Sequence, residues 1–156
     1  GYKVLADDIC VIKPCPENET CAAPAFPAFK LWEDTLLELG KNPASYNRPR
    51  YVLPKYRVPV LEHFHSGMLP IKKIYLLYPY NEQDIKITPL TGMHKFNTFR
   101  NQTYKRRYIK FLGTEQDYFK DASAVVSKIP IEKVNRPIRP FKLNKLIDML
   151  EEDFLK

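Results

Sequence analysis

Two adjacent carboxylates, Asp7 and Asp8, are the residues of this sequence best suited to chemistry. They separate two short apolar runs, residues 2–5 and 9–13, which we expect to form strands that meet at an acidic corner. Carboxylates beside buried strands are costly to desolvate without a partner such as a metal ion. One acid can hold the magnesium ion that bridges phosphates, while its neighbour accepts a proton from the attacking hydroxyl. The alternative is a turn in which Asp7 caps a backbone group and Asp8 is solvated.

The positive charge is concentrated in two segments that contain no acid. They are residues 41–57 and 100–110, and together they hold ten of the 25 basic residues of a chain whose net charge is +7. Without those ten residues, the 18 acids would outnumber the remaining bases. Local patches of this kind suit phosphates or other anions, although a solvated face has the same composition.

Glycine is scarce, and the five glycines form neither GxxxxGK[ST] nor GxGxxG. The chain therefore has no phosphate-cradling loop of its own and cannot bind ATP in the manner of a P-loop protein unaided. His63 and His65 flank Phe64 but have no third residue spaced to complete a metal site, so we expect them in a surface loop.

Composition indicates one folded domain. The 156 residues match the prior of about 100–200 residues for each domain. A hydrophobic fraction of 44% provides apolar area to bury, and no apolar run reaches the roughly 18–20 residues of a membrane span.

The cysteines, Cys10, Cys15 and Cys21, fit neither a disulfide framework nor a CxxC half-site, so we expect thiols and a reducing, cytoplasmic compartment. One bridge stays open as an alternative, since a hairpin could bring two of them together.

The coarse pattern alternates strands with helices and indicates the α/β class. Residues 14–27 have loop or hairpin-tip composition, and residues 43–59 indicate an irregular basic segment or an edge strand. A short helix should end at Gly40, and the pair Thr114 and Asp117 resembles a capping box. We expect further strands at 71–78, 84–88 and 131–134 and helices at 30–39, 88–100, 114–129 and 143–154.

The order of these segments resembles the C-terminal half of HPr kinase-like proteins, serine kinases whose catalytic core is related to phosphoenolpyruvate carboxykinase. Ala-Asp-Asp after a strand matches the magnesium and catalytic motif of that family. The other matching segments mark scaffold, and they are residues 24–32, 70–77, 101–104 and 129–134. The resemblance implies a mixed sheet with flanking helices, with residues 1–156 forming a single but incomplete domain.

The resemblance also implies roles for individual residues. Asp7 matches the general base that acts on a serine hydroxyl, and Asp8 matches the companion acid near magnesium. Arg48, Arg50 and Lys55 are candidates to meet phosphate or substrate by position and charge alone. In the family, a Walker A loop precedes this strand, so we expect the chain to need a separate P-loop portion and to be inactive with ATP and Mg²⁺ alone. The substrate would be a serine of a protein, a peptide or the free amino acid.

The rival hypothesis is a non-catalytic binding or scaffold module. Its two basic patches, with Tyr104 and Tyr108 among the bases of the second, would contact nucleic acid or an acidic partner. The kinase interpretation, in contrast, predicts neither nucleic acid nor membrane as a partner. It also predicts self-association, because an incomplete sheet exposes an edge and an apolar face.

Overall fold

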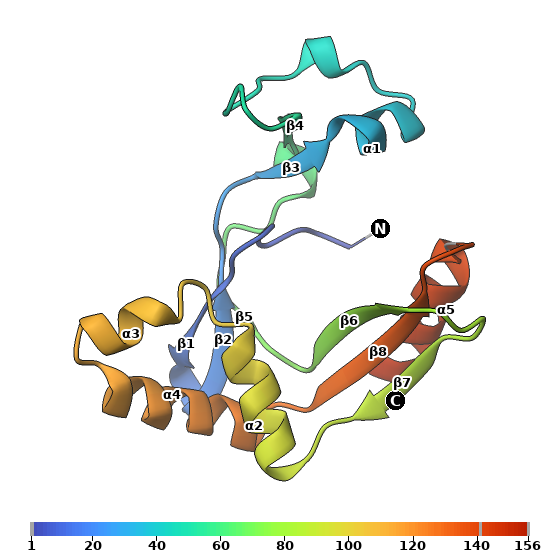
Figure 1. Ribbon diagram of the computed structural model, residues 1–156. Helices are drawn as coiled ribbons and strands as arrows, with labels where there is room; N and C mark the ends of the chain where they lie inside the picture. Colours follow the sequence, from blue (N-terminus) through green and yellow to red (C-terminus); the bar gives the residue numbers. More distant parts are fainter. Residues whose placement is uncertain (1, 141, 156) are drawn as a thin grey trace. The chain divides into compact units, whose positions relative to one another are not determined.

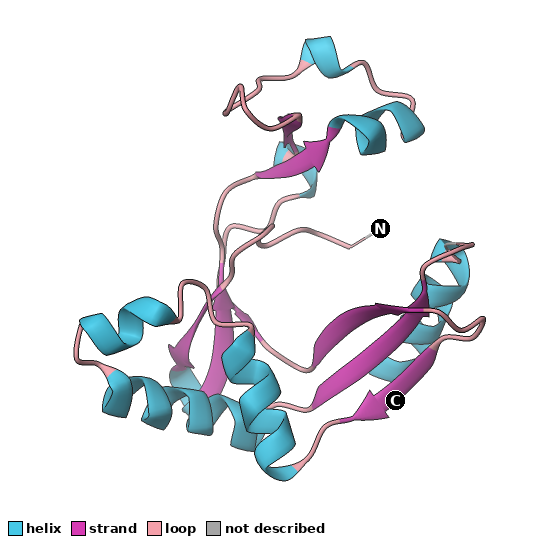
Figure 2. Cartoon of the chain, viewed as in Figure 1, coloured by secondary structure: helices cyan, strands magenta, loops and turns pink. Residues whose placement is uncertain are grey.

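The computed structural model describes residues 2–140 and 142–155, and the chain divides into two compact units, Gly1–Pro70 and Ile71–Lys156. Figure 1 labels the elements of both units, and Figure 2 distinguishes helices from strands. Within the described residues there are three small sheets, one of them mixed, and five α-helices. The α/β class is thus confirmed at this coarse level. The expectation of a single incomplete domain stays a prediction.

The first unit contains two antiparallel sheets. One has the order β1-β2-β5, in which β1 and β2 form a hairpin. The other is the pair β3-β4, and a short helix, α1, follows β3 directly. The bounds are β1 Val11–Cys15, β2 Glu19–Ala23, β3 Ala28–Trp32, α1 Glu33–Glu38, β4 Lys55–Pro59 and β5 Leu69–Pro70, with 3-10 turns at Pro16–Asn18, Pro43–Ser45 and Leu61–His63.

The second unit is a mixed sheet of order β6-β8-β7, with β6 parallel and β7 antiparallel to the central strand β8. Apolar side chains alternate between the two faces of β8. Val134 packs on one face with residues of α5, whereas Ile131 packs on the other with residues of α2 and α4. The bounds are β6 Ile74–Tyr80, β7 Lys86–Pro89, α2 Gly92–Asn101, α3 Arg107–Phe111, α4 Glu115–Lys128, β8 Ile131–Pro137 and α5 Leu143–Phe154.

Several expected elements are confirmed. The last helix has the expected bounds, the helix after Thr114 forms as α4, and the strands expected at 71–78, 84–88 and 131–134 form as β6, β7 and β8 with shifted ends. Gly40 has a positive φ of 67° and donates its N–H to Leu37 O, so it ends α1 as a glycine cap should. The basic segment 43–59 contains an edge strand, β4.

Four local predictions are wrong, one of them only in part. Residues 30–32 form the end of β3 rather than the first turn of a helix, because they pair with β4. The segment 14–27, expected as a loop or hairpin tip, does form a hairpin tip at Pro16–Asn18, but it also contains β2, which pairs with strands on both sides. Thr88 and Pro89 end β7, so the helix begins at Gly92. Thr114 makes no side-chain cap, since its hydroxyl donates to Ile109 O instead.

The cysteine prediction also requires correction. The β1-β2 hairpin brings Cys15 and Cys21 together as a disulfide, whereas Cys10 is an exposed thiol. The spacing of these two residues therefore encodes a hairpin cross-link, the alternative left open above. Among the described helices, none has both the length and the apolar character that a bilayer crossing demands.

Candidate functional site

Asp7 and Asp8 lie on a bend that backbone hydrogen bonds hold in place within the first unit. Val4 donates its N–H to His63 O and accepts from His65 N–H, while Leu5 O accepts from Ala25 N–H. These three bonds fix the segment that leads into the bend between chain segments far away in the sequence. The two carboxylates therefore have a defined position, although they lie outside any regular strand.

Lys30, in β3, contacts both acids. Its backbone N–H donates to Asp7 Oδ2 at 2.9 Å, and its Nζ lies 3.6 Å from Asp8 Oδ2. The side chains of Lys30 and Asp8 are each about half exposed, at 47% and 49%. The acidic corner is thus a cluster of two carboxylates and one ammonium group, and it joins the Ala-Asp-Asp and Phe-Lys-Leu-Trp segments of the sequence.

The surroundings of the acids differ from the sequence-based expectation. Residues 2–5 form a single bridge at Val4 rather than a strand, and β1 begins at Val11. Ile9 is exposed, so apolar core does not flank the carboxylates. Within residues 2–140 and 142–155, the acids belong to no group of three or more metal-ligating side chains. Burial therefore does not require a metal ion at the carboxylates of Asp7 and Asp8, and any bound cation would share these carboxylates with Lys30.

The strand pair β3-β4 continues the site from Lys30. Lys30 pairs with Arg57 and Trp32 pairs with Lys55, so all four side chains lie on the same face of the pair. Lys55 Nζ lies 4.6 Å from the centre of the Trp32 ring. On the opposite face, Val58 is buried. We call Lys30, Trp32, Lys55 and Arg57 the basic face.

The basic face carries more positive than negative charge. In the described parts of the chain, Asp8 is the one carboxylate that forms an ion pair with any of its three cations. Like charges directly opposite on neighbouring strands, such as Lys30 and Arg57, repel each other. A bound anion would relieve that repulsion, so the face is suited to phosphate.

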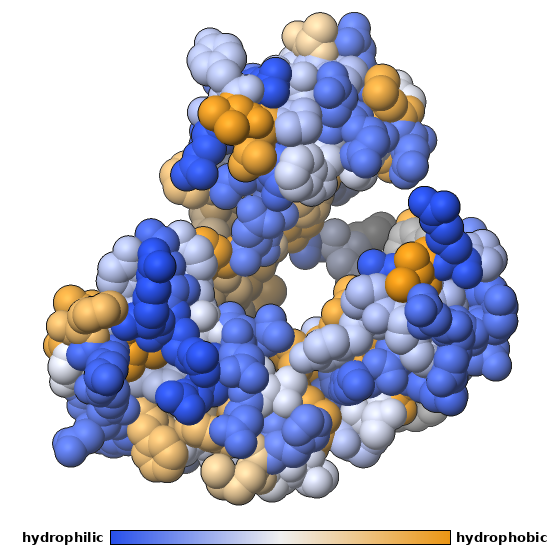
Figure 3. Space-filling view, viewed as in Figure 1, coloured by the Kyte–Doolittle hydropathy of each residue, from blue (hydrophilic) through white to orange (hydrophobic). Residues whose placement is uncertain are grey.

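The other predicted phosphate ligands are placed differently. Lys55 belongs to the basic face, but Arg48 donates through Nε to Leu53 O and through Nη2 to Tyr51 O. The Arg48 guanidinium thus organises the loop before β4. Arg50 is exposed in the same loop, and the described residues contain no ion pair or side-chain hydrogen bond from it to the acidic corner. Figure 3 shows hydrophilic and hydrophobic residues intermixed over the visible surface.

The second basic patch includes α3 and the turn before it. Lys105 Nζ lies 5.3 Å from the Tyr104 ring centre and 5.6 Å from that of Tyr108, and the Arg107 guanidinium lies 5.2 Å from the Tyr108 ring. Phe111, at the end of α3, is strongly exposed. Bases and aromatic rings therefore interleave on the surface, as the binding-module hypothesis expects.

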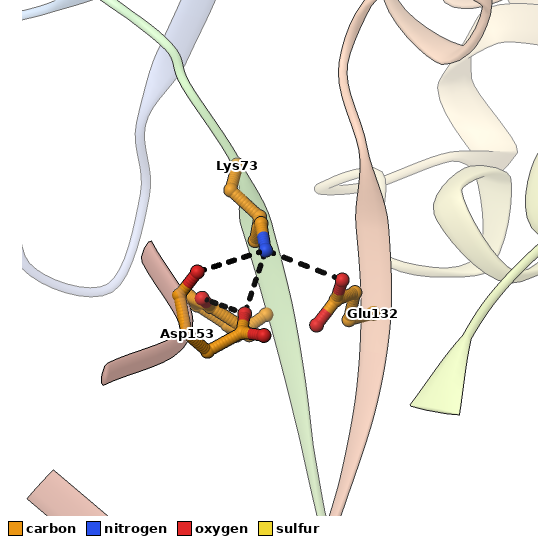
Figure 4. A network of polar contacts seen from close by, with 4 residues as sticks. Lys73, Glu132 and Asp153 are labelled. Carbon is orange, nitrogen blue, oxygen red and sulfur yellow. Dashed lines mark hydrogen bonds and ion pairs between the residues drawn. The ribbon is translucent and has the colours of Figure 1, made fainter. Parts of the chain in front are cut away.

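A polar network that the sequence reasoning missed lies in the second unit. Lys73 Nζ is 2.6 Å from Asp153 Oδ2 and 3.3 Å from Glu132 Oε1 (Figure 4). Tyr75 OH donates to the same Asp153 oxygen at 2.5 Å. Tyr75 and Glu132 are register partners on β6 and β8, whereas Asp153 comes from α5. The network therefore ties the last helix to the sheet.

The network shifts the pKa values of its members in a way that favours structure over catalysis. The hydrogen bond to Asp153 raises the pKa of Lys73, and the bond from Lys73 lowers the pKa of Asp153. Burial, with the bond to Asp153, raises the pKa of Tyr75 to about 12. A lysine held protonated and a tyrosine held neutral act as hydrogen-bond donors, not as bases, near neutral pH.

No protein-family model, curated protein or solved structure matches this chain.

Proposed function

We propose that this chain is the C-terminal part of an ATP- and Mg²⁺-dependent serine kinase similar to HPr kinase. The observation that carries the proposal is Lys30, which binds both Asp7 and Asp8. Asp7 and Asp8 form the motif of the sequence resemblance, and Lys30 belongs to the matching segment 24–32. A carboxylate that can accept a hydroxyl proton, a second carboxylate that can hold magnesium and a nearby ammonium group are all groups that phosphoryl transfer uses.

Asp7 acts as the general base in this proposal. The Lys30 backbone N–H holds Asp7 Oδ2, which orients the carboxylate as it accepts the proton of a serine hydroxyl. The serine belongs to a protein, a peptide or the free amino acid, and a half-exposed corner is accessible to each of these.

Asp8 is the candidate magnesium ligand. Carboxylate oxygen is the donor that Mg²⁺ prefers, and the exposure of Asp8 leaves room for the waters that this ion retains, so the residue fits the ion. Bound magnesium would neutralise phosphate charge during transfer. The Lys30 ammonium, 3.6 Å from Asp8, adds a second positive group beside the same carboxylate.

The basic face would bind the phosphate groups. Lys55 was predicted for this role, and its neighbours on the face, Lys30 and Arg57, join it, whereas Arg48 and Arg50 are assigned to loop structure and to the loop surface. The sequence lacks a glycine-rich phosphate loop, so the chain requires a P-loop portion and is inactive without it.

The test is serine phosphorylation by the natural gene product that contains this chain together with its P-loop portion. Asp7→Asn should lower kcat by about 10²–10⁴-fold, the usual contribution of a general base, and leave the KM for ATP unchanged. Glu38→Gln, an exposed carboxylate at the end of α1, is the matched control and should retain activity. An Asp7→Asn protein with unimpaired kcat would refute the proposal.

A second candidate function is single-stranded nucleic-acid binding by the basic face. It is favoured by the exposed aromatic rings beside the cations, since Trp32 is 43% exposed next to Lys55, and Phe26, 75% exposed, lies next to Arg57. Bases stack on such rings while the cations contact the backbone phosphates.

The two candidates respond differently to salt and to mutation. Oligonucleotide binding, measured by fluorescence anisotropy, should weaken steeply with salt, and Trp32→Ala should cost about 1–3 kcal/mol of binding free energy. It should survive Asp7→Asn, the variant that is expected to slow phosphoryl transfer. Loss of oligonucleotide binding in Asp7→Asn, with Trp32→Ala unaffected, would contradict the second candidate.

A further inference from the structure

The β1-β2 hairpin places three metal-ligating residues on one face. Cys15 and Glu19 are register partners at the end of the hairpin, and Cys21 lies two residues beyond Glu19 on the same strand. Because strand side chains alternate with a period of two, all three point to the same side. The two sulfurs, which are joined in a disulfide in this structure, and a carboxylate oxygen of Glu19 all lie within 4.8 Å of one another.

The strand pairing holds these ligands in place. The hairpin turns through the three residues Pro16–Asn18, and β2 is the central strand of its sheet, with Cys21 paired to Pro70 of β5. Cys21 is buried, whereas Cys15 and Glu19 are half-buried. The backbone thus keeps the two sulfurs close even when no bond joins them, and one side of the group remains open to solvent.

We propose that the reduced hairpin binds a thiophilic divalent cation such as Zn²⁺ through Cys15, Glu19 and Cys21. Cysteine sulfur and carboxylate oxygen are both ligands that zinc accepts in proteins, and three protein ligands leave a fourth position for water. Nothing in this inference depends on the kinase proposal, since the acidic corner and the hairpin use different residues.

The site exists in two exclusive states. In the oxidised state, Cys15 and Cys21 share a disulfide and cannot act as thiolates. A dithiol reductant transfers two electrons and two protons, opens that bond to two thiols and itself becomes a disulfide. Zinc then replaces the two thiol protons, which are released to solvent, so binding is tighter at higher pH. Metal binding would therefore report the redox state of the compartment.

The test titrates Co²⁺, and then Zn²⁺ in competition, into the full chain reduced with a phosphine and kept free of oxygen. We expect one ion for each chain and the sulfur-to-cobalt charge-transfer absorption, and neither should occur in the oxidised chain. Cys15→Ser should abolish that absorption. Glu19→Gln should weaken binding by at least about tenfold, since even residues behind the ligands contribute that much.

Cys10→Ser is the matched control, because Cys10 is an exposed thiol outside the group. It should bind the metal as the unmodified chain does, and circular dichroism of each reduced variant checks that the chain is folded. Failure of the folded, reduced chain to bind Zn²⁺ would overturn the proposal. So would binding that depends on Cys10 or is indifferent to Cys15 and Glu19.

Discussion

Replacing Asp153 with asparagine tests how the last helix is attached to the sheet. Asp153→Asn keeps the shape of the side chain but removes the charge that faces Lys73 at 2.6 Å and accepts from Tyr75. The Asp153 and Lys73 side chains are 25% and 19% exposed, so solvent screens the pair only in part. A hydrogen bond to a charged group contributes about 1.5–3 kcal/mol, and we expect a loss of about 2 kcal/mol in the free energy of unfolding.

Thermal unfolding followed by circular dichroism measures this loss. For a chain of this size, about 2 kcal/mol corresponds to a decrease of roughly 4–8 °C in Tm. Glu82→Gln is the matched control. It breaks the exposed Lys86–Glu82 pair, which has a similar Nζ–carboxylate distance of 3.0 Å, and should leave Tm unchanged within error because solvent screens surface pairs.

The pH dependence makes the prediction sharper. The Asp153 pKa is lowered in the folded state, so its stabilising contribution is complete above the unfolded pKa of about 3.9 and is lost as the pH falls through the folded value. The difference between Asp153→Asn and the unmodified chain should therefore shrink below about pH 4. Equal effects of Asp153→Asn and Glu82→Gln at pH 7 would refute the role assigned to the network.

Three further predictions concern stability. The pKa of Tyr75 is raised to about 12, so folded stability should fall as the pH rises from about 10 toward that value, and Tyr75→Phe should remove the latest step of a tyrosinate absorbance titration. Val134→Ala should destabilise the chain by about 2–3 kcal/mol in chemical denaturation, because the side chain is fully buried and a cavity would remain. Gly40→Ala should lower the free energy of unfolding by about 1–2 kcal/mol. The cost comes from the positive φ of 67° alone, because the added methyl group meets no atom within 4 Å; an unchanged denaturation midpoint would contradict this explanation of the cap.

The sequence predicts secondary structure best where regularly spaced apolar residues form one buried face of an element. The helix α5 repeats its apolar residues at helical spacing and packs them on the sheet, so its bounds follow from periodicity. The strand β6 forms in the most apolar stretch of the chain, which lies between Pro70 and Pro79 and favours a strand over a helix. The prediction of a helix at residues 30–32 was wrong because the local pattern does not decide between helix and strand. Apolar residues there fit both a helix and a strand, and pairing with β4, distant in sequence, decides between them.

The candidate site was predictable in part. The adjacency of Asp7 and Asp8 is visible in the sequence, but their contact with Lys30 spans 23 residues and arises from the fold. Lys55 was identified by charge, whereas Arg57 becomes notable through its register position opposite Lys30. The Lys73 network had a weak signal in the sequence that was overlooked. Glu132 lies between the apolar residues Ile131 and Val134, and Asp153 lies beside the apolar stripe of a helix. Charges at such positions require partners.

The most direct test of the central claim is single-turnover serine phosphorylation by the natural gene product that contains this chain with its P-loop portion. The account predicts Mg²⁺-dependent phosphoserine formation that is slowed about 10²–10⁴-fold by Asp7→Asn, strongly reduced by Lys30→Met and unaffected by Glu38→Gln. Phosphoserine formation that persists at the unmodified rate in Asp7→Asn, or a complete absence of nucleotide-dependent phosphorylation, would contradict it.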